Sequence, residues 1–396
     1  ELAASGGDAG LAPPPEVAAG LDELQAALAP GAALVDIERV HLAEPGQPLH
    51  DLHDVLLWVT RDGAGAIDLG QDEPLDEAIA AWRKALAASA ARVRRGARDP
   101  AMLAETTRAG ERLRALTWDR LPAEVRTASG LFVSPDHNHH DVHWPALPAA
   151  AGGYLAERMP PVQYLSSPIE LLAPRGGDPP ETALAGLVVG APGRRAESAV
   201  AALRSGVDRD SLGRLSEVEA EAATVGEQLD GRGAVRTLIG TAGLESAFKR
   251  LAPTARVLHV AAHGYWEGME DGGAGAEDAG ARPSRLWAGM LGSGLVLEPR
   301  PGPAAEGGAD DGVLLAEELL ALDLRGVELA SMLACRTGEG VTFSREGVLG
   351  LRGALELAGA RRSLLALWPL SDRQARAFSE SFYGRWLAGT DAARAV

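Results

Sequence analysis

The chain contains one cysteine, Cys335, and a histidine, His263, each placed directly after an apolar run of strand length. The histidine stands in Ala-Ala-His-Gly and the cysteine in Leu-Ala-Cys-Arg-Thr-Gly. A thiol needs a base to become a thiolate nucleophile and an acid to protonate an amine leaving group, and a histidine supplies both near neutral pH. The pair therefore predicts nucleophilic catalysis, with Cys335 as the nucleophile and His263 as its acid/base partner.

Gly264 follows the histidine and lets the backbone come close to a substrate. The backbone N–H groups of Gly264 and Cys335 would then face a developing oxyanion. Each residue alone has a plainer interpretation, because a lone cysteine after an apolar strand is most often a small buried hydrophobe and a lone histidine is often a core or capping residue. The occurrence of both at strand ends, each before turn residues, favours the catalytic interpretation.

The elements that would position this pair form a regular pattern in the second part of the chain. Uninterrupted apolar strands alternate with helices there, which indicates an α/β fold with a mainly parallel sheet covered on both faces. Sites in such sheets form at the carboxyl ends of the strands. The expected strands are 184–190, 235–239, 255–262, 327–334 and 363–368, and the expected helices are 214–229, 245–251, 314–321, 347–358 and 372–388.

The first part of the chain predicts a smaller set of elements. Residues 33–42 alternate apolar and polar as a half-buried strand does, and a helix follows Pro74. The other expected elements are strands 54–60, 65–69 and 131–134 and a helix at 101–117. The Pro/Gly-rich stretch 174–180 marks a boundary. We therefore expect a flexible tail at 1–20, an N-terminal half at 21–176, a linker at 177–181 and a C-terminal half at 182–396.

Composition narrows the function classes. The chain has 396 residues, a formal net charge of −17 and a sequence pI of about 5.0, which argues against a nucleic-acid or anionic-membrane partner. A single cysteine allows no intrachain disulfide, and no apolar stretch of about 18 residues is present to span a membrane. We expect a cytoplasmic protein, and the high Ala, Gly and Arg content suggests a bacterial one. The first residue is Glu1, so we expect a piece of a longer chain.

Two motifs resemble those of a known family. The runs 257–264 and 329–338 look like the two catalytic motifs of the CHAT domain, the caspase-like domain often attached to tetratricopeptide repeats. Segments 311–319, 346–351 and 358–369 resemble the family segments that surround the cysteine strand. The resemblance implies peptide-bond hydrolysis without a cofactor, by His263 and Cys335. It also implies a caspase-like, mainly parallel sheet flanked by helices, with a degenerate α/β half at the N-terminal side.

The chain departs from the family pattern in three ways. The family usually continues beyond the position of Val396, which lies in an expected helix. A long Gly/Ala/acidic insertion at 268–285 follows the histidine. This sequence contains no repeat array before the domain, although the family often carries one. An upstream repeat domain is therefore an expected partner.

Two further residues are candidates for substrate binding. In caspase-like enzymes the segment after the strand that bears Trp368 shapes the substrate pocket, so Trp368 and Asp372 are placed near it by the resemblance. An acid at 372 would favour Arg or Lys before the scissile bond. The alternative is that Ser371 to Gln374 form a capping box that opens the last helix.

A histidine cluster offers a different chemistry. His137, His139, His140 and His143 stand around Asp136 and Asp141, and such clusters can bind zinc. We prefer the interpretation that these residues form a solvated loop, and we expect no metal site.

The sequence thus predicts a cysteine endopeptidase that acts on a protein substrate. The acidic insertion within 266–293 and the Gly-rich loop 336–347 have few apolar anchors, which suggests that an activating partner or an upstream sensor region gates the activity. Two alternatives stay open. One is a catalytically silent caspase-like scaffold that binds a partner through its peptide groove, and the other is a hydrolase that uses the same pair on a non-peptide ester.

Overall fold

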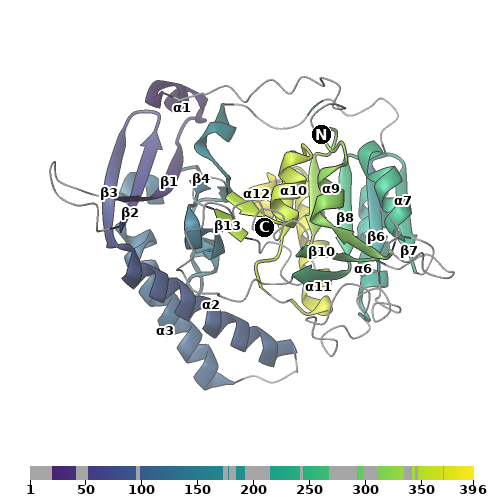
Figure 1. Cartoon of the computed structure of the whole chain (residues 1–396), viewed down its shortest axis with the longest axis horizontal. Coiled ribbons are helices and arrows are strands. Elements are labelled where there is room, and N and C mark those ends of the chain that lie inside the picture. Colours follow the sequence, from purple (N-terminus) through teal and green to yellow (C-terminus); the bar gives the residue numbers. More distant parts are fainter. Residues whose placement is uncertain are drawn as a thin grey trace, which may run out of the picture.

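Two five-stranded sheets, one in each half of the chain, organise the molecule (Figure 1). The computed structural model describes residues 20–41, 52–94, 99–172, 177, 184–191, 215–240, 244–266, 292–297, 311–333, 341–343, 347–368 and 370–396. The expected tail at 1–20 and linker at 177–181 lie outside these ranges apart from Gly20 and Gly177.

The sheet of the N-terminal half, called the mixed sheet below, has the strand order β3-β2-β1-β4-β5. Its strands are β1 (Ala32–His41), β2 (Leu52–Thr60), β3 (Ala64–Gln71), β4 (Gly130–Ser134) and β5 (Val162–Tyr164). The first three pair antiparallel, whereas β1, β4 and β5 are parallel. A turn at Asp62-Gly63 joins β2 to β3, where the N–H of Thr60 donates to the carbonyl oxygen of Gly63.

Helices cover both faces of the mixed sheet. In the larger of the two hydrophobic cores of this half, alternate β1 residues such as Val35 and Ile37 pack against Ile79 and Trp82. The latter two lie on the first helix of a helical hairpin, α2 (Asp72–Arg94). The side chain of Asp99 caps the second helix of that hairpin by accepting from the backbone N–H of Ala101. The helical elements of this half are α1 (Leu21–Ala27), α2 (Asp72–Arg94), α3 (Pro100–Leu116), η1 (Trp118–Arg120), α4 (Ala123–Arg126), η2 (His137–Asp141), η3 (Trp144–Ala146), η4 (Leu155–Glu157) and η5 (Pro168–Leu171).

The sheet of the C-terminal half, called the parallel sheet below, has the order β15-β12-β8-β6-β7, and all of its neighbouring strands pair in parallel. Its strands are β6 (Gly186–Gly190), β7 (Val235–Ile239), β8 (Val257–Ala261), β12 (Leu329–Met332) and β15 (Ser363–Leu365). Every residue of β6, β8 and β12 is buried, which explains their uninterrupted apolar runs.

The two faces of the parallel sheet bury different side chains. Leu258 and Val260 face α7, α9 and α10, whereas Val257 and Leu329 face α6 and α11. The helices of this half are α6 (Val218–Asp230), α7 (Leu244–Leu251), η7 (Ala252–Thr254), α9 (Ala316–Leu320), α10 (Leu351–Leu357), α11 (Asp372–Leu387) and α12 (Ala392–Ala395). Among the helices described in either half, none has the length and apolar character needed to cross a bilayer.

Two small antiparallel sheets occupy positions where the sequence predicted the first residues of helices. The expected helix 314–321 begins later, at Ala316, because β11 (Val313–Leu315) pairs with β10 (Ser293–Val296), which pairs in turn with β9 (His263–Trp266). The expected helix 347–358 is also shorter, because β14 (Gly347–Leu349) forms a hairpin with β13 (Val341–Phe343). A short apolar run does not by itself distinguish strand from helix, and here the partner strand decides.

Candidate active site

His263 lies where the chain leaves the parallel sheet. Strand β8 ends at Ala261, the backbone bends at Ala262, and His263 opens β9. There His263 pairs with Val296 and Gly264 with Leu295, both on β10. The side chain of His263 is buried, with 6% of its surface exposed. The structure therefore sets the predicted acid/base residue at the carboxyl end of a central, fully buried strand.

Cys335 lies outside the described residues, and the described chain leads to Leu333, two residues before it. Strand β12, which precedes Cys335, is the parallel neighbour of β8, which precedes His263. In their register Ser331 is the partner of His259. The structure thus brings together the two strands that lead to the predicted catalytic residues, and the roles of His263, Gly264 and Cys335 stay predictions.

Trp368 and Asp372 lie on either side of the turn that joins β15 to α11. The ring of Trp368 contacts that of His143 in the N-terminal half, with 6.2 Å between ring centroids. The carboxylate of Asp372 accepts hydrogen bonds from the backbone N–H of Ser216 at 2.8 Å and of Glu217 at 3.2 Å. Burial opposes ionisation, but these hydrogen bonds hold the pKa of Asp372 below its usual value.

Asp372 thereby ties the start of α11 to the start of α6. The capping box anticipated as the alternative is also present, because Ser371 accepts from the backbone N–H of Gln374 and Gln374 reaches back to Ser371. The contacts give Asp372 a structural role, and its role in substrate recognition stays a prediction.

The histidine cluster is not a solvated loop, so that interpretation was wrong for His139 and His140. Both are buried in the 3-10 helix η2, which packs against α2 and against the hairpin β13–β14. Burial lowers the pKa of His140 to about 3, and the nearby charge of Arg352 acts in the same direction. Within the described ranges, no group of three His, Cys, Asp or Glu side chains is arranged to hold a metal ion.

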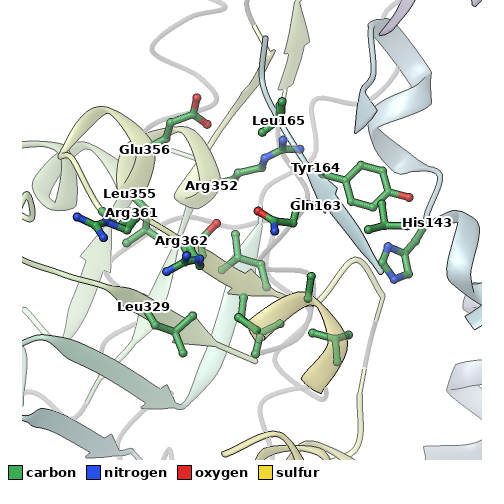
Figure 2. A pocket seen from close by; sticks show the side chains of 18 of the residues that line it. His143, Gln163, Tyr164, Leu165, Leu329, Arg352, Leu355, Glu356, Arg361 and Arg362 are labelled. Carbon is green, nitrogen blue, oxygen red and sulfur yellow. The ribbon is translucent and has the colours of Figure 1, made fainter. Parts of the chain in front are cut away.

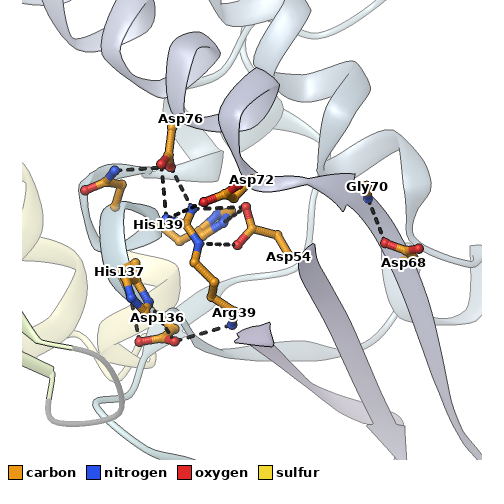
Figure 3. A network of polar contacts seen from close by, with 10 residues as sticks. Arg39, Asp54, Asp68, Gly70, Asp72, Asp76, Asp136, His137 and His139 are labelled. Atoms are coloured by element: carbon orange, nitrogen blue, oxygen red, sulfur yellow. Dashed lines mark hydrogen bonds and ion pairs between the residues drawn. The ribbon is translucent and has the colours of Figure 1, made fainter. Parts of the chain in front are cut away.

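A polar network anchors η2 to the mixed sheet (Figure 3). Arg39 of β1 pairs with Asp54, its register partner on β2, at 2.9 Å, and with Asp76 of α2 at 2.7 Å. His139 of η2 lies 3.4 Å from the same Asp54. Burial tends to raise the pKa of Asp54, but the contacts with His139 and Arg39 lower it to about 2. Sequence reasoning missed this network, although opposite charges at matching positions of a hairpin are its signal.

A second polar cluster lies under the parallel sheet. Its members are buried and come from three elements: His259 from β8, Glu221 from α6, and Ser379 and Tyr383 from α11. His259 lies within the expected apolar strand 255–262, and its buried partners were not predicted. The signal was an ionisable residue at the centre of an apolar run, since such a residue needs buried partners.

A cavity of about 260 Å³ lies at the seam between the two halves (Figure 2). It is bordered by β5 at the edge of the mixed sheet, by β15 at the edge of the parallel sheet, and by α10 and α12. His143 borders the cavity, and burial lowers its pKa to about 4. Neither His263 nor Gly264 lines this cavity, so it is distinct from the strand ends that carry the predicted chemistry.

Comparison with known proteins adds two findings. A family model described as the CHAT domain matches residues 107–396. The fold is similar to a chain of the Saccharomyces cerevisiae separase–securin complex, with a TM-score of 0.51 and 8% sequence identity. The match covers 94% of this chain and 29% of that chain, so this chain spans less than a third of its structural relative. The likeness shows a caspase-like fold. No curated protein matches the sequence.

Proposed function

Because this chain belongs to the CHAT domain family, we propose that it is a cysteine endopeptidase that hydrolyses a protein substrate through Cys335 and His263. The observation that carries the proposal is the parallel pairing of β8 with β12. His263 follows His259 by four residues, and Cys335 follows Ser331, the register partner of His259, by four residues as well. Leu333 directly follows β12, and Cys335 follows Leu333 by two positions in the sequence.

The proposed reaction is acyl transfer to the thiol. His263 takes the proton of the Cys335 thiol, and the thiolate attacks the scissile carbonyl carbon. His263 then gives the proton to the leaving amine, and a water that it activates hydrolyses the acyl-enzyme. The backbone N–H groups of Gly264 and Cys335 stabilise the oxyanion of each tetrahedral intermediate. The reaction requires no cofactor, and a cytoplasmic location in a bacterium is part of the proposal.

Gating by a partner or an upstream region is supported by contacts between the halves. The hairpin β13–β14, which begins six residues after Cys335, contacts η2 of the N-terminal half. Two residues of η2 contact the rest of the N-terminal half: His139 lies 3.4 Å from Asp54 of β2, and Asn138 donates to Asp76 of α2 at 3.1 Å. A ligand that displaced η2 would therefore act on the segment that follows the nucleophile.

The test is cleavage-site profiling with a peptide library, in which the purified chain is compared with its Cys335→Ala form. We expect cleavage by the unaltered chain alone, together with native-state alkylation of Cys335 by iodoacetamide at a rate above that of a free thiol. A preference for Arg or Lys before the cleaved bond would support a recognition role for Asp372. Alkylation only after denaturation, with no cleavage, would contradict the peptidase and favour the scaffold alternative.

A further inference from the structure

The polar cluster under the parallel sheet occupies a layer from which charge is usually excluded. His259 stands in the middle of β8 and is fully buried, and its contacts with Glu221 of α6 and Tyr383 of α11 place it on the face that these two helices cover. Glu221 and Tyr383 are buried beside it, among apolar side chains of the same layer. An ionisable group in such surroundings destabilises the fold unless it is paired, so the cluster has to act as a unit.

The contacts connect one strand to two helices. Glu221 Oε1 lies 3.3 Å from His259 Nε2, an ionic contact that lacks the alignment of a hydrogen bond, and accepts a 2.6 Å hydrogen bond from Ser379 Oγ. The Tyr383 hydroxyl lies 3.4 Å from His259 Nδ1. Burial raises the pKa of Tyr383, so the phenol keeps its proton and can donate it to Nδ1.

The two helices that hold His259 are themselves joined along their length. Asp372 binds the backbone of Ser216 and Glu217, the two residues before α6, and Arg376 of α11 pairs with Glu217 at 2.8 Å. Farther along, Gln228 of α6 donates to the carbonyl oxygen of Glu380 at 3.2 Å. Helices α6 and α11 are therefore linked to each other by polar contacts. His259 is the residue of β8 whose side chain makes polar contacts with both helices.

The geometry points to a positioning network: Glu221, His259 and Tyr383 hold β8 in alignment with β12, and so align His263 with Cys335. This inference rests on the proposed dyad. Apolar contacts are non-directional, whereas the Tyr383 hydroxyl, 3.4 Å from His259 Nδ1, gives the β8 side chain a directional contact with α11. His259 also lies beside Ser331, its register partner on β12. His259 precedes His263 by four residues, and Ser331 precedes Cys335 by four residues. A displacement of about 1 Å in a reacting pair can lower its rate about 100-fold.

The test measures the thiol itself and needs no substrate. Tyr383→Phe removes one hydroxyl and keeps the ring, and Phe382→Leu is the matched control because Phe382 is buried in the same layer on the same helix. For each variant, the rate of Cys335 alkylation by iodoacetamide is measured from pH 5 to pH 10, together with the melting temperature. We expect an apparent thiol pKa below the ordinary value of about 8.5 in the unaltered chain. We expect Tyr383→Phe to raise it by about one unit, and Phe382→Leu to leave it unchanged at an equal or larger loss of melting temperature.

The outcomes separate the two proposals. An unaltered thiol profile in Tyr383→Phe, or an equal shift in Phe382→Leu, would overturn the positioning network and leave the dyad standing. An ordinary thiol pKa in the unaltered chain would overturn the dyad and the network together. Should Tyr383→Phe not fold, Glu221→Gln carries the same test, because it keeps an acceptor for Ser379 and removes the charge that faces His259.

Discussion

The two halves of the molecule have a similar pair of strands and use it differently. Strands β1 and β4 in the mixed sheet, like β8 and β12 in the parallel sheet, are parallel neighbours whose carboxyl ends lie at one edge. In the N-terminal half these ends carry Arg39 and Asp136, and the backbone N–H of Arg39 donates to the Asp136 carboxylate at 3.4 Å. In the C-terminal half they lead to His263 and Cys335.

The two halves differ in where their buried charged residues lie relative to the sheet. In the N-terminal half, Arg39 near the end of β1 pairs with both Asp54 and Asp76, and Asp54 also contacts His139, so α2 and η2 are held to the sheet. In the C-terminal half, the corresponding polar contacts lie beneath the sheet, where Glu221 and His259 meet. Such a separation places structural charge in one layer and the proposed reactive pair in another, so that variants in the two halves should affect stability and catalysis to different degrees.

The largest expected effect is on catalysis. Cys335→Ala and His263→Gln should each lower kcat/KM by about 1,000-fold or more, because a nucleophile and its base act as a unit. The melting temperature should change little. Initial rates on the best peptide from the library provide the measurement, with Arg112→Ala as a surface variant of the other half that should keep most of the activity. Near-normal turnover by His263→Gln would contradict the dyad.

The next effect concerns stability in the N-terminal half. Arg39→Ala leaves the Asp54 carboxylate, which is 0% exposed, without its guanidinium partner, and the expected loss is about 3–5 kcal/mol. Urea unfolding measures the free energy. The matched control is Arg112→Ala, because the bridge from Arg112 to Glu77 spans 3.5 Å between side chains that are 54% and 65% exposed. That variant should lose less than about 0.5 kcal/mol. Equal losses of unfolding free energy in the two variants would show that burial does not make the Arg39–Asp54 pair more important for stability than the exposed Arg112–Glu77 pair.

The fall in unfolding free energy at low pH should depend on the same carboxylate, that of Asp54. The pKa of Asp54 falls from 3.8 to about 2 on folding, so its contribution of about 2 kcal/mol is present above pH 4 and is lost as the pH falls through 2. Asp54→Asn should remove this part of the pH dependence. The measurement is the difference in unfolding free energy between the two proteins from pH 2 to pH 5. A constant difference across that range would rule out the assignment.

The last effect has the opposite sign. Burial raises the pKa of Asp36 from 3.8 to about 7, and the charges of Glu38 and Asp136 add to the rise. The folded state therefore favours the protonated carboxyl, and stability should decline as the pH rises from 4 through 7. Asp36→Asn should stabilise the protein at pH 8 and have little effect at pH 4. Thermal unfolding at both pH values tests this, and a loss of stability at pH 8 would contradict it.

The elements that could be predicted are those whose pattern is local. The expected strand 235–239 coincides with β7, and the expected helix 372–388 ends within one residue of α11. The 3-10 helix η2 was missed because its partners, α2 and the hairpin β13–β14, are distant in the chain, and β14 was missed because it is a strand of only three residues. Isolated short strands are only marginally stable, so their own residues carry a weak signal.

The amino-acid sequence by itself determined which strands lead to His263 and Cys335 and where the long helices lie, because apolar periodicity is a property of neighbouring residues. Only the tertiary structure decided that β8 pairs with β12 and sets Ser331 beside His259. It also decided that Arg39 meets Asp76 and that Glu221 meets His259. Those contacts join residues far apart in the chain, and a buried charge is stable only when the completed fold supplies its partner.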